Sequence, residues 1–377
     1  MTLGIVLTVV LVALIFEYIN GFHDTANSIA TVVATKVLTP FQAIVMASTT
    51  NFLGALWGTA VAKTIASGLV DASVVRVTPE ILICALTGGI LWNLLTWRLG
   101  LPSSSSHALI GGLCGAAFAA ANDNWAALIW SQPADPIYHS KGLLWKVVVP
   151  MVSSPLGGFL LGLLLMGVLF ALISWLHSLG GAFKQSVKPR YVNGFFGKAQ
   201  IVSASAMGLM HGMNDAQKTM GIIALALVGG TTVGALDNLP SWLEFLHLPA
   251  PGPGQELDIP LWIKITCAIV MAAGTAAGGW RIVKTLGHKL VKLQPIHGFC
   301  AETASATMIG IASALGIPVS TTHNISAAIM GVGTAKRGNA VKWSIVERMV
   351  WAWILTLPVS AGVAYMLVHL SKSAGWI

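Results

Sequence analysis

The sequence predicts an all-α polytopic membrane protein that consists of two related halves. Of its 377 residues, 55% are hydrophobic and only 9% are charged, whereas a soluble protein of this size needs far more charge on its surface. Apolar runs recur along the whole length, and each is close to the roughly 20 residues with which a helix crosses a bilayer. In addition, two short motifs each occur twice, in the same order.

The apolar runs predict membrane-spanning helices. They cover residues 2–19, 41–62, 144–176, 261–280 and 346–370. These runs are continuous, whereas the strands of a membrane barrel alternate between apolar and polar residues. We expect roughly ten to twelve membrane segments. The net charge of +8 comes from basic residues beside these segments, which is typical of membrane proteins and does not indicate nucleic-acid binding.

The first repeated motif contains an aspartate. Residues 20–28 read Asn-Gly-Phe-His-Asp-Thr-Ala-Asn-Ser, and residues 211–219 read His-Gly-Met-Asn-Asp-Ala-Gln-Lys-Thr. When the two copies are aligned on glycine, Asp24 matches Asp215. A buried carboxylate within a membrane segment is costly and usually functional, so both aspartates are candidate sites for a sodium ion or a proton. A helix N-cap at the membrane surface is the alternative.

Several neighbours of the aspartates carry oxygen atoms that a hard cation could use. These neighbours are Thr25, Asn27, Gln217 and Thr219.

Lys218 stands where the first copy has Asn27. Its ammonium could pair with Asp215 and take the place of a bound cation, or it could contact an anion directly. The alternative is a lysine that extends to the membrane surface. The first interpretation favours protons over sodium as the coupling ion.

The second repeated motif predicts an anion site. Residues 99–107 read Leu-Gly-Leu-Pro-Ser-Ser-Ser-Ser-His, and residues 315–323 read Leu-Gly-Ile-Pro-Val-Ser-Thr-Thr-His. Pro102 and Pro318 suit the first turn of a helix, so the hydroxyl residues would lie at a helix N-terminus, where free N–H groups attract anions. The apolar runs that follow are short, which predicts half-helices of two re-entrant hairpins with their tips near the bilayer midplane. Ordinary helix capping by serine is the alternative.

The other ionisable residues of the motifs and of the apolar segments are candidates without a fixed role. Four histidines belong to the motifs: His23, His107, His211 and His323. Those that end the Ser/Thr motifs could shuttle protons or make a structural hydrogen bond. Glu17 and Glu302 lie in apolar stretches and could pair with a cation or carry a proton.

The charges of the loops predict that the two halves have opposite orientations. Residues 121–140 and 231–260 contain acidic residues and no Lys or Arg, whereas residues 177–198 contain four basic residues and no acid. The segments beside the second Ser/Thr motif, 281–292 and 336–348, are also basic. Because cytoplasmic loops are enriched in Lys and Arg, corresponding loops lie on opposite sides of the membrane.

We therefore expect an inverted repeat of residues 1–183, a cytoplasmic connector of residues 184–198, and a second repeat of residues 199–377. Both termini should face the periplasm. Inverted repeats are a common route to alternating access in transporters, because two copies can exchange conformations around a central site.

These motifs resemble those of the inorganic phosphate transporter (PiT) family. The family signature is a repeated Gly-x-Asn-Asp; Gly212–Asp215 fits it, and Gly21–Asp24 has His23 in place of the asparagine. The Pro–Ser/Thr–His motifs match in both halves, and the resemblance extends from about Leu3 to Leu370. The short segment between the halves is similar to compact bacterial members, which predicts a protein of the bacterial plasma (inner) membrane.

The resemblance implies import of inorganic phosphate by symport with protons or sodium. The phosphate residues that it implies are Ser104, Ser105, Ser106, Ser320, Thr321 and Thr322. The coupling residues are Asp24, Asn27 and Asp215, together with Lys218, which replaces the usual asparagine of the second signature and argues against a symmetric pair of sodium sites. Secondary candidates are His107, His323, Asn214, Thr25, Thr219, Gln217 and Glu302. The resemblance further implies a homodimer and transport of phosphate, in some members as a metal–phosphate complex; we expect no cofactor and no tightly bound metal.

Three other functions fit less well. The same architecture could carry another oxyanion such as sulfate, although only protonated phosphate can donate a hydrogen bond to Asp24 or Asp215. An anion channel would not need inverted repeats. An intramembrane aspartyl protease would need two carboxylates that share a proton and has no use for Ser/Thr hairpins. We therefore do not expect an enzyme.

Overall fold

The computed structural model describes residues 3–137, 140–237, 239–252 and 257–376. The outermost residues of the two predicted repeats, 1–2 and 377, lie outside this part of the chain. The described residues form helices and loops, and their only β-type pairings are the isolated bridges Val70–Leu128 and Gln132–Lys141. The prediction of an all-α protein is therefore confirmed.

The helices of the first half are α1 (Leu3–Ala34), α2 (Pro40–Ala55), α3 (Ala60–Ser67), α4 (Pro79–Leu99), α5 (Ser105–Ala120) and α6 (Val149–Ser178). The short helix α7 (Gly181–Ser186) connects them to α8 (Pro189–Thr232), α9 (Leu261–Ala277), α10 (Trp280–Lys284), α11 (Pro295–Ala314), α12 (Thr321–Lys336) and α13 (Trp343–Ser373). Shorter 3₁₀ segments occur at Trp125–Ala127, Ser241–Leu246 and Gly338–Ala340, and π-helical segments at Leu144–Val148 and Thr285–Leu290.

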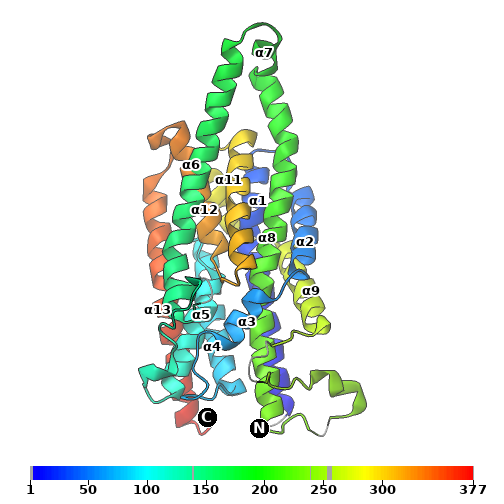
Figure 1. Cartoon of the computed structure of the whole chain (residues 1–377), viewed down its shortest axis with the longest axis vertical. Helices are drawn as coiled ribbons and strands as arrows, with labels where there is room; N and C mark the ends of the chain where they lie inside the picture. The colour runs from blue at the N-terminus through cyan, green and yellow to red at the C-terminus, as the bar shows by residue number, and fades with distance from the viewer. Residues whose placement is uncertain (1–2, 138–139, 238, 253–256, 377) are drawn as a thin grey trace.

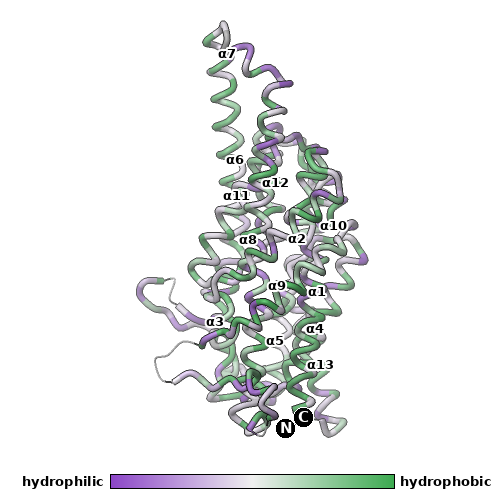
Figure 2. Tube along the Cα trace, turned by 90° about the vertical axis from the view of Figure 1, so that its right-hand side faces the viewer, coloured by the Kyte–Doolittle hydropathy of each residue, from purple (hydrophilic) through white to green (hydrophobic). Residues whose placement is uncertain are grey.

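The bundle is elongated, and its two ends differ in charge. Both termini lie at one end, and α7 lies at the other, where α6 and α8 project beyond the remaining helices (Figure 1). The described residues of the acidic segments, 121–137, 140, 231–237, 239–252 and 257–260, lie at the end with the termini. Figure 2 shows hydrophobic residues along most of the bundle and hydrophilic ones around α7 and in the loops. This separation of charge agrees with the inversion that the loops predict.

The two halves exchange packing partners. Helix α5 packs against α13 of the second half, and α12 packs against α6 of the first half. Glycines allow these approaches, because a Cβ at Gly115 would lie 2.1 Å from Ala361 O and a Cβ at Gly331 would lie 2.0 Å from Phe159 O. Helices α2 and α9 are exchanged in the same way and pack against α8 and α1. Corresponding elements therefore make corresponding contacts, as an inverted repeat requires.

Length and composition identify four described helices that could cross a membrane: Leu3–Ala34, Pro79–Leu99, Leu144–Ser178 and Trp343–Ser373. Two bent pairs, α2–α3 and α9–α10, would raise this number to six. The sequence predicted more membrane segments because it also included shorter and more polar helices. Helices α5 and α12 have only 16 residues each, and α8 carries the polar motif 211–219 near its middle.

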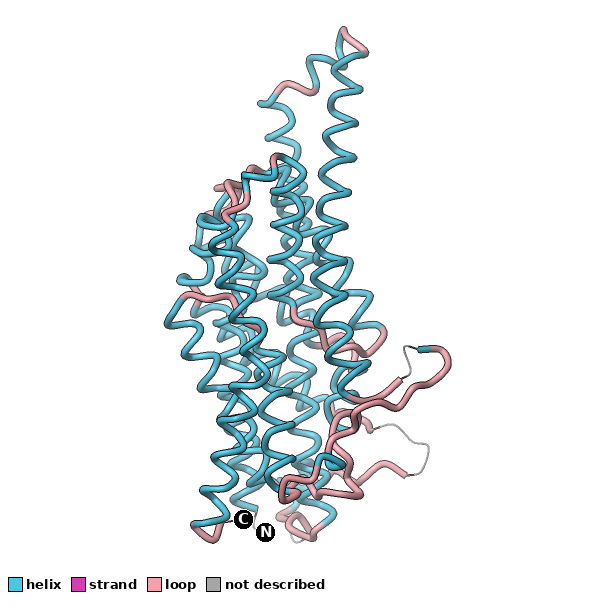
Figure 3. The backbone as a smooth tube through the Cα atoms, turned by 90° about the vertical axis from the view of Figure 1, so that its left-hand side faces the viewer, coloured by secondary structure: helices cyan, strands magenta, loops and turns pink. Residues whose placement is uncertain are grey.

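Two apolar runs that we expected to be continuous are broken. The chain bends by 69° between α2 and α3 and by 57° between α9 and α10. Figure 3 shows that loops interrupt helices within the bundle as well as at its ends. Gly278, with a φ of 72°, is the C-cap that ends α9, and Gly58, with a φ of 84°, lies two residues after the C-cap of α2; both φ values are in the left-handed region that suits glycine.

Candidate anion and cation site

The two Ser/Thr motifs build two equivalent helix N-termini near the centre of the bundle. Ser104 is the N-cap of α5, and its hydroxyl accepts a hydrogen bond from His107 N at 3.2 Å. Ser320 is the N-cap of α12 and accepts one from His323 N at 3.1 Å. Serine capping therefore does occur, but it involves one hydroxyl of each motif and leaves the others for different partners.

The prolines of the motifs do not lie where the sequence suggested. Each helix begins three residues after its proline, so Pro102 and Pro318 precede the first turn. Gly100 and Gly316, with φ of 65° and 64°, reverse the chain after α4 and α11. The prolines therefore lie in the extended segment between this reversal and the cap, and the capping serine determines where the helix begins.

Four hydroxyl residues form the first turns of α5 and α12. Ser105, Ser106, Thr321 and Thr322 are all buried, with at most 4% of each residue exposed. Ser106 Oγ lies 3.4 Å from Val319 O, so the two hairpin tips contact each other. Ser105 Oγ has no hydrogen-bond partner among the described residues. Two positive helix ends and these hydroxyls meet at one place, which is the chemistry of an anion site.

Both signature aspartates lie inside long helices beside the tip of α12. Asp24 lies in α1 and Asp215 in α8, so neither is a helix N-cap. Thr322 Oγ1 donates to Asp24 Oδ1 at 3.1 Å, and Thr321 Oγ1 donates to Asp215 Oδ2 at 3.0 Å. Asn27 Nδ2 donates to both threonine hydroxyls, at 3.1 and 2.9 Å. The tip of α12 therefore joins the carboxylates of the two halves.

Lys218 is buried at the same place. Only 2% of its surface is exposed, so it does not extend to the membrane surface. Its ammonium donates to the Asp215 carboxylate, to Ser106 Oγ of the α5 tip, and to Val319 O at 3.1 Å. One fixed positive charge thus holds α8 and both hairpin tips together.

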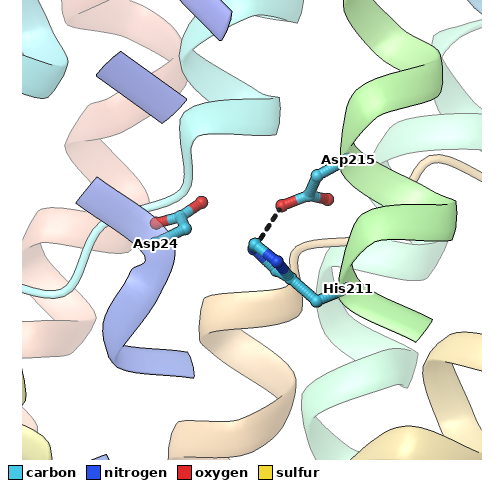
Figure 4. Close-up of side chains that lie close together, drawn as sticks. All are labelled: Asp24, His211 and Asp215. Carbon is cyan, nitrogen blue, oxygen red and sulfur yellow. Dashed lines mark ion pairs between the residues drawn. The ribbon is translucent and has the colours of Figure 1, made fainter. Parts of the chain in front are cut away.

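Two histidines support the aspartates, and their contacts suggest where a metal ion could bind. His23 Nδ1 lies 2.7 Å from Asp24 Oδ1, and His211 Nε2 lies 3.2 Å from Asp215 Oδ2. Three possible ligand atoms lie within 4.8 Å of one another, one each from Asp24, His211 and Asp215. Figure 4 shows the two carboxylates facing each other across the gap between α1 and α8, with His211 beside them.

His107 and His323 meet between the two halves. Their ring centroids are 4.9 Å apart, and His323 stacks on Trp353 at 4.3 Å. Neither nitrogen of His323, nor Nδ1 of His107, has a hydrogen-bond partner in the described part of the chain. These contacts give no structural hydrogen bond for the His323 ring.

Three secondary candidates hold helices together instead of lining the centre. Thr25 Oγ1 lies 2.7 Å from Gly21 O of its own helix and 3.3 Å from Thr275 O of α9, and Asn214 Nδ2 donates to Ser313 Oγ of α11 at 2.7 Å. Gln217 Oε1 accepts from Val61 N at 2.8 Å and so caps α3.

The two membrane glutamates have different surroundings. Glu302 accepts hydrogen bonds from Thr31, Ser203 and Gln200, so both of its oxygens have donors. Glu17 accepts a hydrogen bond from the Thr219 hydroxyl. That hydroxyl therefore does not donate to the aspartates. These long-range pairs could not be deduced from the sequence, because nothing in the local pattern indicates which helix faces which.

A separate cavity of about 450 Å³ lies between α3, α5 and α8, on the side of the site toward the termini. Its lining is mostly apolar and includes Ile65, Leu113 and Leu225. Asp71 and Arg76 are its charged residues.

The inverted bundle with its buried, hydroxyl-rich hairpin tips defines a membrane transporter and not an enzyme. The model of the phosphate transporter family matches residues 20–364. The chain therefore belongs to the phosphate transporter family.

Relatives cover almost the whole chain. A "Probable low-affinity inorganic phosphate transporter" of Rhizobium meliloti (strain 1021) is 44% identical over 351 residues, which are 93% of this chain and 91% of that protein. A protein of the same name from Bacillus subtilis (strain 168) is 40% identical over 375 residues, which are 98% of this chain and 99% of that protein. Among solved structures, "The sodium-dependent phosphate transporter" has the same fold, with a TM-score of 0.76, 24% identity, and coverage of 98% of this chain and 99% of that chain.

Proposed function

We propose that this protein imports inorganic phosphate across the bacterial inner membrane by cation-coupled symport, with protons as the favoured co-ion. The observation that carries the proposal is the tip of α12, where Thr321 and Thr322 donate to the aspartates of both halves. The hydroxyls suited to an anion and the carboxylates suited to a cation therefore share hydrogen bonds. Binding of one partner changes the surroundings of the other, which is the requirement for coupling.

The hairpin tips would hold the phosphate. Ser105, Ser106, Thr321 and Thr322 supply hydroxyls, and Ser104 and Ser320 fix the two helix ends that supply N–H groups. A protonated phosphate can also donate a hydrogen bond to a carboxylate, whereas sulfate cannot. The names of the two relatives support phosphate as the substrate.

Lys218 favours protons over sodium. Its ammonium contacts Asp215 where a bound cation would otherwise be expected, and Asn27 occupies the equivalent place beside Asp24. The two signature aspartates therefore cannot form a symmetric pair of sodium sites. Asp24, which has no such ammonium beside it, would take part in coupling through its hydrogen bond from Thr322.

A metal–phosphate complex is a second candidate substrate. The spacing of Asp24, His211 and Asp215 fits a divalent ion next to the anion site, and carboxylate and imidazole are common metal ligands. If the complex is carried, Mg²⁺ or Ca²⁺ should raise uptake at a constant concentration of free phosphate. Uptake that falls in proportion to the free phosphate removed would refute it.

Alternating access would exchange the conformations of residues 1–183 and 199–377 around the hairpin tips. The basic connector 184–198 would be cytoplasmic and both termini periplasmic, because the two ends of the bundle differ in charge as described above. The family resemblance also predicts a homodimer, which cross-linking in membranes would detect.

The decisive experiment is uptake of radiolabelled phosphate into proteoliposomes, with proton and sodium gradients imposed separately. We expect accumulation that follows the proton gradient without sodium and that excess unlabelled phosphate, but not sulfate, suppresses. Protein-free liposomes are the control. Uptake that ignores both gradients, or that stays linear with substrate concentration, would identify a channel instead of a symporter.

A further inference from the structure

Glu17 is a buried carboxyl that the second half does not repeat. Its exposed fraction is 0%, and it lies seven residues before Asp24 on α1, about 10 Å toward the end with the termini. When the signature motifs are aligned, Gly208 is its counterpart. A Cβ at Gly208 would lie 2.1 Å from Thr50 Oγ1, so the second half has no room for such a side chain. Glu17 is therefore a feature of one half, as Lys218 is of the other.

The surroundings of Glu17 leave its charge uncompensated. Oε2 accepts the hydroxyl of Thr219, and the Asn20 side chain lies near the carboxyl, but Oε1 accepts no well-aligned hydrogen bond from the described residues. No Lys, Arg or His side chain in the described ranges lies within ion-pair distance of it. The titratable groups that face it are Asp215 and Lys218 on α8 and Cys267 on α9. Because Lys218 pairs with Asp215, its charge is not free to balance Glu17.

A buried carboxylate without a cation costs several kcal/mol, and the uptake of a positive charge offsets this cost. The open oxygens at this place are Glu17 Oε1 and Asn20 Oδ1, one turn further along α1. Hard metal cations generally take about six oxygen ligands, so two open oxygens suit a proton better than a metal ion.

Glu302 is the rival carboxyl, and its contacts rank it lower. Both of its oxygens already accept hydrogen bonds, from hydroxyl and amide donors of α1 and α8. Such donors stabilise a carboxylate in place and leave no open oxygen for a transferred proton. Of the two membrane glutamates, Glu17 alone has an oxygen that accepts no hydrogen bond from the described residues.

We propose that Glu17 carries the proton that is coupled to phosphate import. The carboxylate takes up one proton from the periplasmic side and later releases it toward the cytoplasm, so one O–H bond forms and breaks and no other bond changes. Thr219 connects this event to the anion site, since it follows Lys218 directly and lies one helical turn from Asp215. The inference rests on the proposed function, phosphate symport.

The test compares two modes of transport in proteoliposomes. Phosphate exchange, with equal phosphate on both sides, needs no net proton movement, whereas accumulation against a gradient does. We expect Glu17→Gln to retain exchange and to lose accumulation, so that internal and external phosphate become equal and uptake no longer depends on the proton gradient. Glu347→Gln, the same change at an exposed glutamate of α13, is the matched control and should behave as the wild type does.

Glu17→Asp separates a proton carrier from a structural role. It keeps the carboxyl group, so accumulation should persist with an altered pH profile; this variant also decides the question if Glu17→Gln does not fold. Accumulation by Glu17→Gln at the wild-type level, or loss of exchange and accumulation together in both variants, would overturn the inference. If instead the wild-type protein neither exchanges nor accumulates phosphate, the proposed function fails.

Discussion

Replacing Lys218 by asparagine tests whether its ammonium takes the place of a transported cation. The substitution recreates in the second half the residue that Asn27 provides in the first. It removes the positive partner of Asp215 together with the hydrogen bonds to Ser106 Oγ and Val319 O. Removing one partner of a buried ion pair costs about 3–5 kcal/mol. At about 1.4 kcal/mol per factor of ten, the folding equilibrium without sodium should shift by about 100-fold or more toward the unfolded state, so the melting temperature should fall, and uptake without sodium should fall with it.

Sodium should reverse this loss, because a bound ion can again neutralise Asp215. Phosphate uptake by Lys218→Asn, measured against sodium concentration, should therefore become sodium-dependent, and sodium should raise its melting temperature in detergent. Lys198→Asn, on the same helix but exposed, is the matched control and should remain indifferent to sodium. Uptake by Lys218→Asn at the wild-type rate, with unchanged ion dependence, would refute the reasoning.

Three further substitutions test other parts of the account. Asp24→Asn should abolish coupled uptake, and a wild-type rate would remove this carboxylate from the mechanism. Ser105→Ala should raise the KM for phosphate about tenfold, because it removes one hydrogen bond to a charged ligand. The melting temperature should change little, since the Ser105 hydroxyl has no partner among the described residues. Gly115→Ala should destabilise the protein by about 1–3 kcal/mol, since the new Cβ would lie 2.1 Å from Ala361 O. Gly362→Ala is the control, because a Cβ at Gly362 would lie in open space. Equal melting temperatures of the two variants would contradict this packing.

The sequence predicted the hairpins and the paired aspartates because each motif occurs twice. Repetition fixes equivalent positions, and the structure places Ser104 and Ser320, or Asp24 and Asp215, in equivalent local settings. The roles of individual residues within a motif were less accessible. Gln217 and Thr25 have oxygens suited to a cation, yet they bind backbone groups of neighbouring helices, Val61 N in α3 and Thr275 O in α9.

Contacts between distant segments account for what the sequence could not predict. Glu17 meets Thr219, 202 positions away, and Glu302 meets Thr31, 271 positions away. Such pairs depend on the rotation of each helix about its axis, which composition does not reveal in helices that are apolar on most sides. The breaks beside Gly58 and Gly278 did have a local signal, a glycine within an apolar run, but they were hidden by the continuous hydrophobicity around them.

A structure determined with phosphate bound tests the central claim most directly. The account predicts phosphate density between the N-termini of α5 and α12, within hydrogen-bond distance of Ser105, Ser106, Thr321 and Thr322. Phosphate bound elsewhere, for example beside Arg76 in the cavity toward the termini, with none at the hairpin tips, would contradict it.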